Sequence, residues 1–423
     1  MKVMVIGNGG REHTIVWKLA QSPLVSKIYC CPGNGGTATI AENVNIITLA
    51  EMAEFAVREG IELTVVGPET YLADGIVDIF KEKSLKIYGP SKAAAMLESS
   101  KAFSKEFMKK YHIPTAAFET FEQADAAKDY LQRVGVPVVV KADGLAAGKG
   151  VIVAFDMETA FQAIDDIMTS RIFGESGASV VIEEYLEGEE ASLLAFCDGN
   201  IAVPMLPAQD HKRIGDNDSG PNTGGMGTYA PTTVISPELM RIITTEILDP
   251  TMIAMQKEGT PFVGTLFVGL MLTQSGPKVI EYNVRFGDPE TQVVLPLLES
   301  DLAQVFLDAV NGQLDAYNLQ WKTGHSAVCV VAASGGYPGS YETGKIITGL
   351  NDVSKSLVFH AGTKLDGEGK VVTAGGRVIN VVHIAETIDN AIEGAYQDLK
   401  LINFEEIYYR KDIARRELER LKN

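Results

Sequence analysis

The polar side chains between residues 281 and 292 have the types and spacing of a metal site. Glu281 and Asn283 stand two positions apart in a predicted strand, Lys278–Asn283, so both side chains project from the same face. Two such oxygen ligands suit Mg²⁺, which binds a few carboxylate or amide oxygens together with phosphate and water. Mn²⁺ accepts the same oxygen ligands. We therefore predict that Glu281 and Asn283 bind Mg²⁺ or Mn²⁺; the structural alternative is a surface strand with polar outward positions.

An anion site is predicted directly after these ligands. If the strand continues, Arg285 shares their face, and its guanidinium can hold a carboxylate or a phosphate. The turn Gly287–Glu290 then presents backbone N–H groups. The density of polar groups beside apolar neighbours favours a site over a surface strand.

A second motif is typical of phosphate binding. Lys141 ends an apolar strand, and a glycine-rich loop through Gly144, Gly148, Lys149 and Gly150 follows it. The lysine can neutralise phosphate charge, and loop amides can approach closely because glycine has no Cβ. Three residues, not four, separate Gly144 from Gly148, and Gly150 replaces Ser or Thr, so this is not a Walker A loop. The alternative is a hairpin turn with a snorkelling lysine.

The strand Val180–Leu186 ends in carboxylates and is a candidate for adenine and ribose binding. Backbone exposed beside Glu183, Glu184 and Tyr185 could pair with an adenine edge, and Glu190 is close enough to bind ribose hydroxyls. Without further support, an acidic surface turn explains this segment better.

The N-terminal glycine turn does not fit a dinucleotide site. Gly7-Asn-Gly9-Gly10 begins like GxGxxG, but Glu12 stands at the third glycine position, and the second strand ends in Cys30-Cys31-Pro32 rather than in an acidic residue. A dehydrogenase is therefore disfavoured. Backbone N–H groups at a helix N-terminus can still hold an anion such as phosphate. A tight strand-to-helix turn remains an equally good interpretation.

The elements that position these residues begin with a parallel sheet. Strands are predicted at Val3–Ile6, Lys27–Cys30, Leu63–Val66 and Leu85–Tyr88, each followed closely by glycine or proline. This rhythm indicates βαβ units. The turns Gly7–Gly10, Gly33–Gly36 and Gly67-Pro68-Glu69 would lie at the carboxyl edge of the sheet, where ligands bind.

The rest of the chain alternates strands and helices. A helix capped by Ser99 or Ser100 should run to about Tyr111, and further strands are predicted at Pro137–Val140, Thr265–Leu272 and Lys278–Asn283. A helix is predicted near 299–311, and a βαβ-rich segment from His325. Residues 210–227 show no periodicity and are expected to be a structureless functional loop.

Composition limits the possible functions. The chain has 423 residues, enough for two to four domains, and a net charge of −18 that argues against nucleic-acid and anionic-membrane binding. The four cysteines form neither a disulfide framework nor a zinc motif, which indicates a reducing, cytoplasmic environment. No apolar run approaches the ~18 residues of a membrane span.

The order of these motifs resembles that of ATP-grasp ligases. Along the chain, the motifs follow the order seen in that family: Lys105, Lys141 with its glycine loop, Glu183–Leu186 and then the Glu281/Asn283 pair. Five further segments are similar to signatures of the phosphoribosylamine–glycine ligases: Arg285–Gln292, Gln209–Arg213, Gly220–Gly227, Gly7–His13 and Pro32–Thr37. This resemblance covers essentially the whole chain. It implies an N-terminal open parallel α/β domain (1–101), an ATP-grasp domain (102–312, lid 115–190) and a small C-terminal domain (325–423), an α/β and α+β architecture.

The resemblance also implies a reaction. Glycine would attack the γ-phosphate of ATP, and 5-phosphoribosylamine would then attack glycyl phosphate to give glycinamide ribonucleotide, in purine synthesis. Arg285, Asp210 and Lys141 are the expected catalytic residues. ATP is expected at Lys105, Lys141, Gly148, Lys149, Gly150, Glu183, Glu184, Tyr185, Leu186 and Glu190. The other two substrates are expected at Gly9, Gly10, Arg11, Gly35, Gly36, Thr37, Gly67, Pro68, Glu69, Asp210, Arg285, Gly287, Asp288, Pro289, Glu290 and Thr291.

Some expectations depart from the family pattern or remain alternatives. Many ATP-grasp enzymes have a further acidic metal ligand one strand earlier, but Thr265–Leu272 contains no carboxylate, so Glu290 could contribute instead. The alternatives are another ATP-grasp carboxylate–amine ligase or carboxylase of purine synthesis, and a non-catalytic nucleotide-binding module. The enzyme is expected to act as a monomer on small molecules, without nucleic-acid or membrane partners.

Overall fold

The computed structural model describes residues 1–146, 150–315 and 319–422. It begins with the predicted parallel sheet, whose strand order is β3-β2-β1-β4-β5. The strands are β1 Lys2–Gly7, β2 Lys27–Pro32, β3 Glu42–Asn43, β4 Leu63–Val66 and β5 Ile87–Tyr88, and the helices between them are α1 Gly10–Leu19, α2 Leu49–Glu59, α3 Glu69–Ala73 and α4 Ile76–Glu82. β1 lies between β2 and β4, so the direction of winding reverses beside it. The turns after β1 and β4 therefore lie side by side at this edge.

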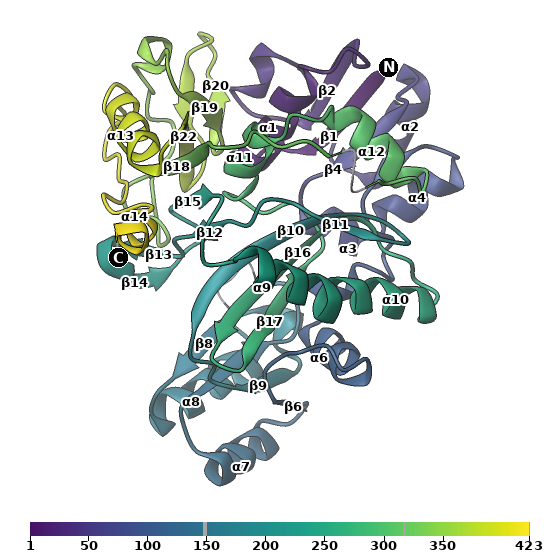
Figure 1. The fold of residues 1–423 in the computed structure, drawn as a ribbon, viewed down its shortest axis with the longest axis vertical. Helices are drawn as coiled ribbons and strands as arrows, with labels where there is room; N and C mark the ends of the chain where they lie inside the picture. Colours follow the sequence, from purple (N-terminus) through teal and green to yellow (C-terminus); the bar gives the residue numbers. More distant parts are fainter. Residues whose placement is uncertain (147–149, 316–318, 423) are drawn as a thin grey trace.

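The middle of the chain forms two antiparallel sheets. One has the order β6-β9-β7-β8 and is covered by α7 and α8 at the bottom of Figure 1. Its elements are β6 Phe118–Phe121, α7 Ala124–Val134, β7 Val138–Ala142, β8 Val151–Ala154, α8 Met157–Ile164 and β9 Val180–Glu184. It has a small core of its own, which includes Val140, Ile164 and Ile182. This separate core allows the segment to be a unit distinct from the rest of the molecule.

The second antiparallel sheet lies at the centre of the molecule, with the order β11-β10-β16-β17. Its strands are β10 Glu189–Asp198, β11 Ala202–Pro204, β16 Val263–Thr273 and β17 Gly276–Asn283. The helices of this part of the chain are α5 Met96–Ser99, α6 Lys101–Lys110, α9 Pro237–Ile243, α10 Asp249–Lys257, α11 Thr291–Val294 and α12 Leu302–Val310. The predicted helix after Ser100 is α6, and the Ser100 hydroxyl accepts the Phe103 amide at its N-terminus, at 3.1 Å.

The C-terminal part differs from the prediction because its sheet is antiparallel. The order is β12-β15-β18-β22-β19, and β18 pairs directly with β22. The βαβ-rich expectation after His325 is therefore wrong: β19, β20 and β21 separate β18 from β22 and no helix of an α/β crossover lies between them. The elements are β12 Gln209–Asp210, β15 Gly227–Ala230, β18 Ser326–Ala333, β19 Leu357–His360, β20 Thr363–Leu365, β21 Val371–Thr373, β22 Arg377–Ala385, α13 Ile388–Leu399 and α14 Arg415–Lys422.

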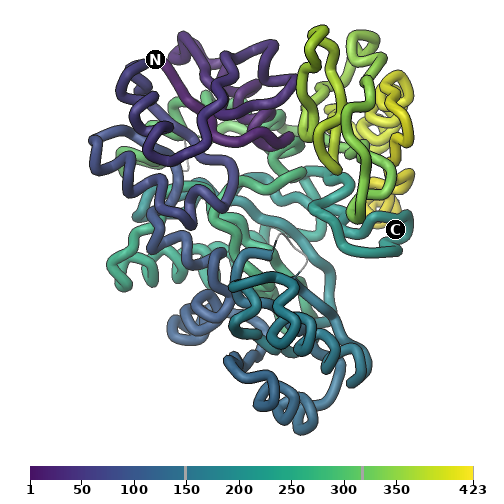
Figure 2. The backbone as a smooth tube through the Cα atoms, turned by 180° about the vertical axis from the view of Figure 1, so that it is seen from behind, coloured from purple at the N-terminus to yellow at the C-terminus, as the bar shows by residue number. Residues whose placement is uncertain are grey.

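Residues 210–227 are also more ordered than expected. β13 Arg213–Gly215 pairs with β14 Ser219–Asn222 in a short hairpin, and the flanking β12 and β15 join the C-terminal sheet. Strands of two to four residues are too short to give a detectable alternation, which is why the sequence pattern missed them. Figure 2 shows the N- and C-terminal parts side by side above the two middle sheets. Among the described residues, none of the helices has the length and apolar character needed to cross a membrane.

Candidate functional site

Two lysines and one carboxylate form the buried centre of the predicted ATP site. Lys105 Nζ lies 2.9 Å from one carboxylate oxygen of Glu183, and Lys141 Nζ lies 2.8 Å from the other. The three side chains come from α6, β7 and β9 and are at most 4% exposed. Burial lowers the pKa of Lys105 to about 8, although Glu183 opposes the shift. The cluster has one excess positive charge, which suits it to bind phosphate.

Glu281 and Asn283 lie on one face of β17, as their spacing predicted, next to this cluster. Burial acts to raise the pKa of Glu281, but Lys212, Lys141 and Lys101 outweigh it and hold the pKa below its usual value. Glu281 is therefore an ionised carboxylate. Opposite it, Gly269 on β16 leaves room: a Cβ there would lie 3.4 Å from Glu281 Cγ. This pair of oxygen donors fits a hard divalent cation that also binds phosphate.

Lys101 was not predicted from the sequence. Its Nζ donates to the Gly144 carbonyl at 3.1 Å, and burial lowers its pKa while Glu281 opposes that shift. Lys101 and Lys105 are four residues apart on α6, so both face the site. The carboxylate of Asp143 accepts the Ala102 amide at 2.8 Å and so joins the glycine-rich loop to the start of α6. The four-residue spacing of Lys101 and Lys105 is the sequence signal that could have identified Lys101.

Arg285 is close to the predicted metal ligands, although β17 ends at Asn283, as predicted, and does not continue to Arg285. Its guanidinium donates to Asn283 Oδ1 at 3.0 Å. It also pairs with Glu69 at 3.0 Å and with Glu98 at 3.1 Å. The turn after β4 therefore contacts the segment that follows β17 directly.

Glu98 is a second functional candidate that sequence reasoning missed. It accepts the Val284 amide at 2.7 Å as well as pairing with Arg285. Burial raises the pKa of Glu98 to about 7, while Arg285 acts against the shift. No local pattern marks this residue, because its partners lie almost 190 positions away in the chain.

A polar cluster around Asp210 lies beside these residues. Lys212 pairs with Glu190 at 2.7 Å, and Glu190 and Asp210 raise the pKa of Lys212 against the effect of burial. Burial and the nearby Glu190 carboxylate raise the pKa of Asp210, and burial and Asp210 raise the pKa of Glu290 to about 7. Glu290 also accepts the Ser192 hydroxyl at 3.1 Å. Arg416 of α14, which was not predicted, donates to the Asp210 carbonyl.

The turn Gly287–Thr291 lies against the N-terminal helix α1. Asp288 accepts the Arg11 amide at 3.3 Å and the Gln292 side-chain amide at 2.8 Å. A Cβ on Gly287 would lie 2.4 Å from a Glu290 carboxylate oxygen, so only glycine fits there. Within the turn, the Thr291 hydroxyl donates a hydrogen bond to the Gly287 carbonyl at 2.6 Å. Pro289 separates Asp288 from Glu290 within it.

In the turns after β1 and β4, the carboxylate of Glu12 takes the place of a bound anion. Glu12 is 1% exposed and accepts the Gly9 amide at 2.6 Å and the Arg11 guanidinium at 2.5 Å. A Cβ on Gly67 would lie 1.9 Å from Glu12 Oε1. Glu12 therefore fills the space between the turns after β1 and β4, which explains why it replaces the third glycine of a dinucleotide motif. Pro68 caps α3 in the second of these turns.

The turn after β2 packs against the C-terminal part. The Gly35 amide donates to the Thr363 carbonyl at 3.3 Å, and the amides of Gly36 and Thr37 donate to Asn34 Oδ1 at 2.9 and 3.0 Å. Gly10, Gly35 and Gly36 lie where the N- and C-terminal parts meet, since a Cβ on them would lie 2.5, 3.1 and 2.6 Å from side chains of the C-terminal part. These contacts place the predicted substrate turns in one region of the molecule.

The predicted adenine segment follows the lysine cluster. Glu184 accepts the Ala117 amide at 3.0 Å and pairs with Lys278 at 2.9 Å, and Tyr185 packs edge-on against Phe155. Leu186 follows it in the chain and is partly buried. Gly150 accepts the Ala142 amide at 2.8 Å through its carbonyl. The predicted ATP residues Gly148 and Lys149 lie outside the described residues.

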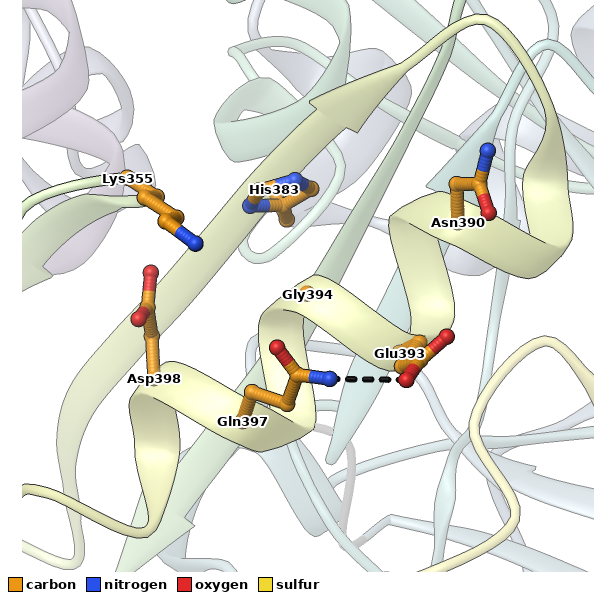
Figure 3. Close-up of a pocket in the computed structure, with 7 residues that line it drawn as sticks. All are labelled: Lys355, His383, Asn390, Glu393, Gly394, Gln397 and Asp398. Carbon is orange, nitrogen blue, oxygen red and sulfur yellow. Dashed lines mark hydrogen bonds between the residues drawn. The ribbon is translucent and has the colours of Figure 1, made fainter.

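A cavity of about 200 Å³ on the C-terminal part is separate from this site. Figure 3 shows Lys355, His383 and Asp398 around it, with Gln397 bonded to Glu393 on α13. It shares no lining residue with the predicted site.

Comparison with known proteins agrees with this geometry. Three family descriptions match in order: Phosphoribosylglycinamide synthetase, N domain (residues 1–98), ATP-grasp (A) domain (99–291) and C domain (327–416). Phosphoribosylamine–glycine ligases of Nostoc sp. and Caldanaerobacter subterraneus are 51% and 49% identical to the chain, each over 98% of it and 99% of their own length. A crystal structure of the ligase from Thermotoga maritima has a TM-score of 0.84 and 34% identity, over 97% of this chain and 100% of that one.

The fold and the site define an ATP-grasp enzyme, in which lysines and the predicted metal ligands Glu281 and Asn283 lie at one centre beside two antiparallel sheets. More particularly, the chain belongs to the phosphoribosylamine–glycine ligase family. This confirms the predicted three-part fold and the predicted class, an ATP-dependent ligase of purine biosynthesis.

Proposed function

We propose that this enzyme joins glycine to 5-phosphoribosylamine through a glycyl phosphate intermediate. The glycine carboxylate attacks the γ-phosphate of ATP and ADP leaves. The amine of phosphoribosylamine then attacks the acyl carbon, and phosphate leaves with formation of glycinamide ribonucleotide. The observation that carries the proposal is the direct pairing of Arg285 with Glu69 beside Asn283. It brings a carboxylate-binding group, a metal ligand and a turn of the N-terminal sheet into contact.

The residues divide between the substrates as follows. Lys105 and Lys141 neutralise the ATP phosphates, which suits a phosphoryl transfer that depends on positioning and charge. Gly148, Lys149 and Gly150 bind the phosphates, while Glu183–Leu186 and Glu190 hold adenosine. Arg285, Asp210 and the turn Gly287–Thr291 hold glycine and its acyl phosphate. The turns around Gly9–Arg11, Gly35–Thr37 and Gly67–Glu69 hold phosphoribosylamine.

Glu281 and Asn283 would hold Mg²⁺ or Mn²⁺, which supplies charge neutralisation between the transferring phosphates. Glu290 is available as a further oxygen ligand. Lys141 and Lys212 keep Glu281 ionised for this purpose.

The acyl phosphate must be protected from water. We propose that the 115–190 lid and the Gly220–Gly227 segment close over the site, within domains 1–101, 102–312 and 325–423. We further propose that the enzyme acts as a monomer in the cytoplasm, where its four free thiols stay reduced.

The test is ADP release with Mg²⁺-ATP, glycine and phosphoribosylamine generated in the cuvette, with each substrate omitted in turn. Release that needs all three substrates and equals the glycinamide ribonucleotide formed supports the proposal. Release with a different carboxylate, and none with glycine, would keep the ATP-grasp chemistry and overturn the substrate assignment. Replacing Mg²⁺ with Mn²⁺ in the same assay compares the two metals.

A further inference from the structure

The side chain of Arg377, at the start of β22, joins two turns of the site. One is Gly287–Thr291, and the other contains Gly224 and Gly225. Arg377 Nη1 donates to the carbonyls of Asp288 and Gly224, at 2.7 Å each, and to that of Gly225 at 3.3 Å. The same nitrogen lies 3.3 Å from the Asp288 carboxylate. A residue of the C-terminal sheet therefore holds two segments of the ATP-grasp part together.

The two turns are in tight contact where Arg377 holds them. Gly225 has φ +112°, and a Cβ there would lie 2.5 Å from Pro289 Cδ. A Cβ on Gly224 would lie 2.9 Å from Arg377 Cζ. Consecutive glycines are needed because no side chain fits between the turns. Tyr337, also from the C-terminal part, accepts the Gly224 amide with its hydroxyl at 3.0 Å.

Charge favours the same arrangement. Asp288 raises the pKa of Arg377 although burial acts to lower it, and Arg377 and Arg11 hold the pKa of Asp288 below its usual value against burial. Asp288 accepts the Arg11 amide with its other carboxylate oxygen. The ion pair thus links the N-terminal helix α1, the Gly287–Thr291 turn and β22.

We propose that Arg377 is a positioning residue that keeps the Gly224–Gly225 turn closed over the Gly287–Thr291 turn and thereby shields the acyl phosphate from water. This inference rests on the proposed function. When the closure fails, a water oxygen bonds to the acyl carbon as the carbon–oxygen bond to phosphate breaks. Glycine and phosphate are released, so one ATP is converted to ADP without product. Arg377 therefore controls coupling rather than phosphoryl transfer itself.

The test measures ADP and glycinamide ribonucleotide in parallel for the full-length enzyme and for Arg377→Met, which keeps an unbranched apolar stem but removes the charge and the donors. Loss of one charge-assisted hydrogen bond shifts a closed–open equilibrium by roughly tenfold. We expect the ratio of ADP to product to rise several-fold, with the KM for ATP nearly unchanged. Arg377→Lys, which retains a cationic donor, should restore part of the coupling. Arg241→Met is the matched control, because Arg241 is exposed and pairs only with exposed Glu238 in the contacts described.

The outcomes separate this inference from the proposed function. Wild-type enzyme that releases no ADP with all three substrates would overturn the proposed function. Wild-type coupling together with equal ADP and product in Arg377→Met, at any rate, would overturn the role of Arg377 alone. If Arg377→Met does not fold, Tyr337→Phe decides: it removes one hydroxyl, and an unchanged ratio in that variant counts against the closure.

Discussion

At the scale of residues, the site consists of charges that are already paired before substrates bind. Glu183 neutralises part of the Lys105 and Lys141 charge, and Glu69 and Glu98 hold Arg285. Buried charges need such partners, because an unpaired one is costly in a low-dielectric interior. Binding of ATP phosphates or of a glycine carboxylate can then replace these partners without exposing the cations to an apolar environment.

Glu281→Ala should abolish turnover and leave the fold intact. The substitution removes the only carboxylate of the predicted metal pair, and loss of one electrostatic contact to a transition state costs about 100- to 1,000-fold in kcat. Steady-state ADP release and the circular-dichroism melting curve check the two parts of the prediction. Near-wild-type activity would contradict the metal assignment. Glu238→Ala, at an exposed carboxylate that pairs with exposed Arg241, is the control.

The lowered pKa of Lys105 predicts that activity is lost at alkaline pH. Burial lowers its pKa to about 8, so the ammonium is present below pH 8 and is lost as the pH rises through that value. The pH profile of kcat/KM for ATP, which reports the free enzyme, should fall above about pH 8, and this fall is the alkaline limb of the profile. In Lys105→Arg this limb should disappear, because a guanidinium stays charged. Lys110→Arg, at an exposed position of the same helix, should keep it; persistence of the limb in Lys105→Arg would refute the assignment.

At the scale of elements, two strand-to-helix turns are built around a buried side chain. Glu12 fills the space that glycines leave after β1 and β4, and its carboxylate satisfies the amide of Gly9. A helix N-terminus attracts an anion, and in this turn the chain provides one. The parallel sheet is thus locked to α1 close to the Gly287–Thr291 turn.

Gly67→Ala should destabilise the N-terminal sheet. Its Cβ would lie 1.9 Å from a carboxylate that is fully enclosed, so the turn or Glu12 must move, at a cost of about 1–3 kcal/mol. Differential scanning calorimetry should show a lower Tm. Gly367→Ala is the matched control, since a Cβ there meets nothing within 4 Å; equal Tm values for the two variants would contradict the packing argument.

At the scale of the whole molecule, the site depends on contacts between all three parts. Arg285 joins the N-terminal turn to β17, and Arg377 and Arg416 extend from the C-terminal part to Asp288 and Asp210. ATP binding between the two middle sheets should therefore stabilise the assembled molecule.

A non-hydrolysable ATP analogue with Mg²⁺, at 100 times its Kd, should raise the free energy of unfolding by about 2.7 kcal/mol. Differential scanning fluorimetry would show this as a higher Tm. Lys141→Met should abolish the shift, because the buried ammonium proposed to bind phosphate is gone, and chelation of the metal should reduce it. Lys83→Met, at an exposed position of the N-terminal part, should retain the full shift. A full shift in Lys141→Met would remove Lys141 from the ATP site.

Much of the fold could be predicted because its signals are local. The parallel strands β1, β2 and β4 and the helix α6 follow from apolar runs, glycine punctuation and a serine cap. The expected loop at 210–227 was wrong because its strands are too short to give an alternating pattern, and the βαβ pattern after His325 was wrong because strand pairing partners there lie far apart in the chain. β15, for example, pairs with β18 about 100 residues later.

The sequence by itself determined which residues are candidates for the chemistry. Glu281 and Asn283 share a face because the side chains of a strand alternate, and Lys141 precedes its glycine loop whatever the rest of the chain does. Only the tertiary structure decided what holds these groups in place. Glu98 pairs with Arg285, Glu12 fills the glycine turns, and Arg377 joins two turns because folding brings distant buried charges together. Such pairs are selected by desolvation and distance in space, which no local spacing in the sequence records.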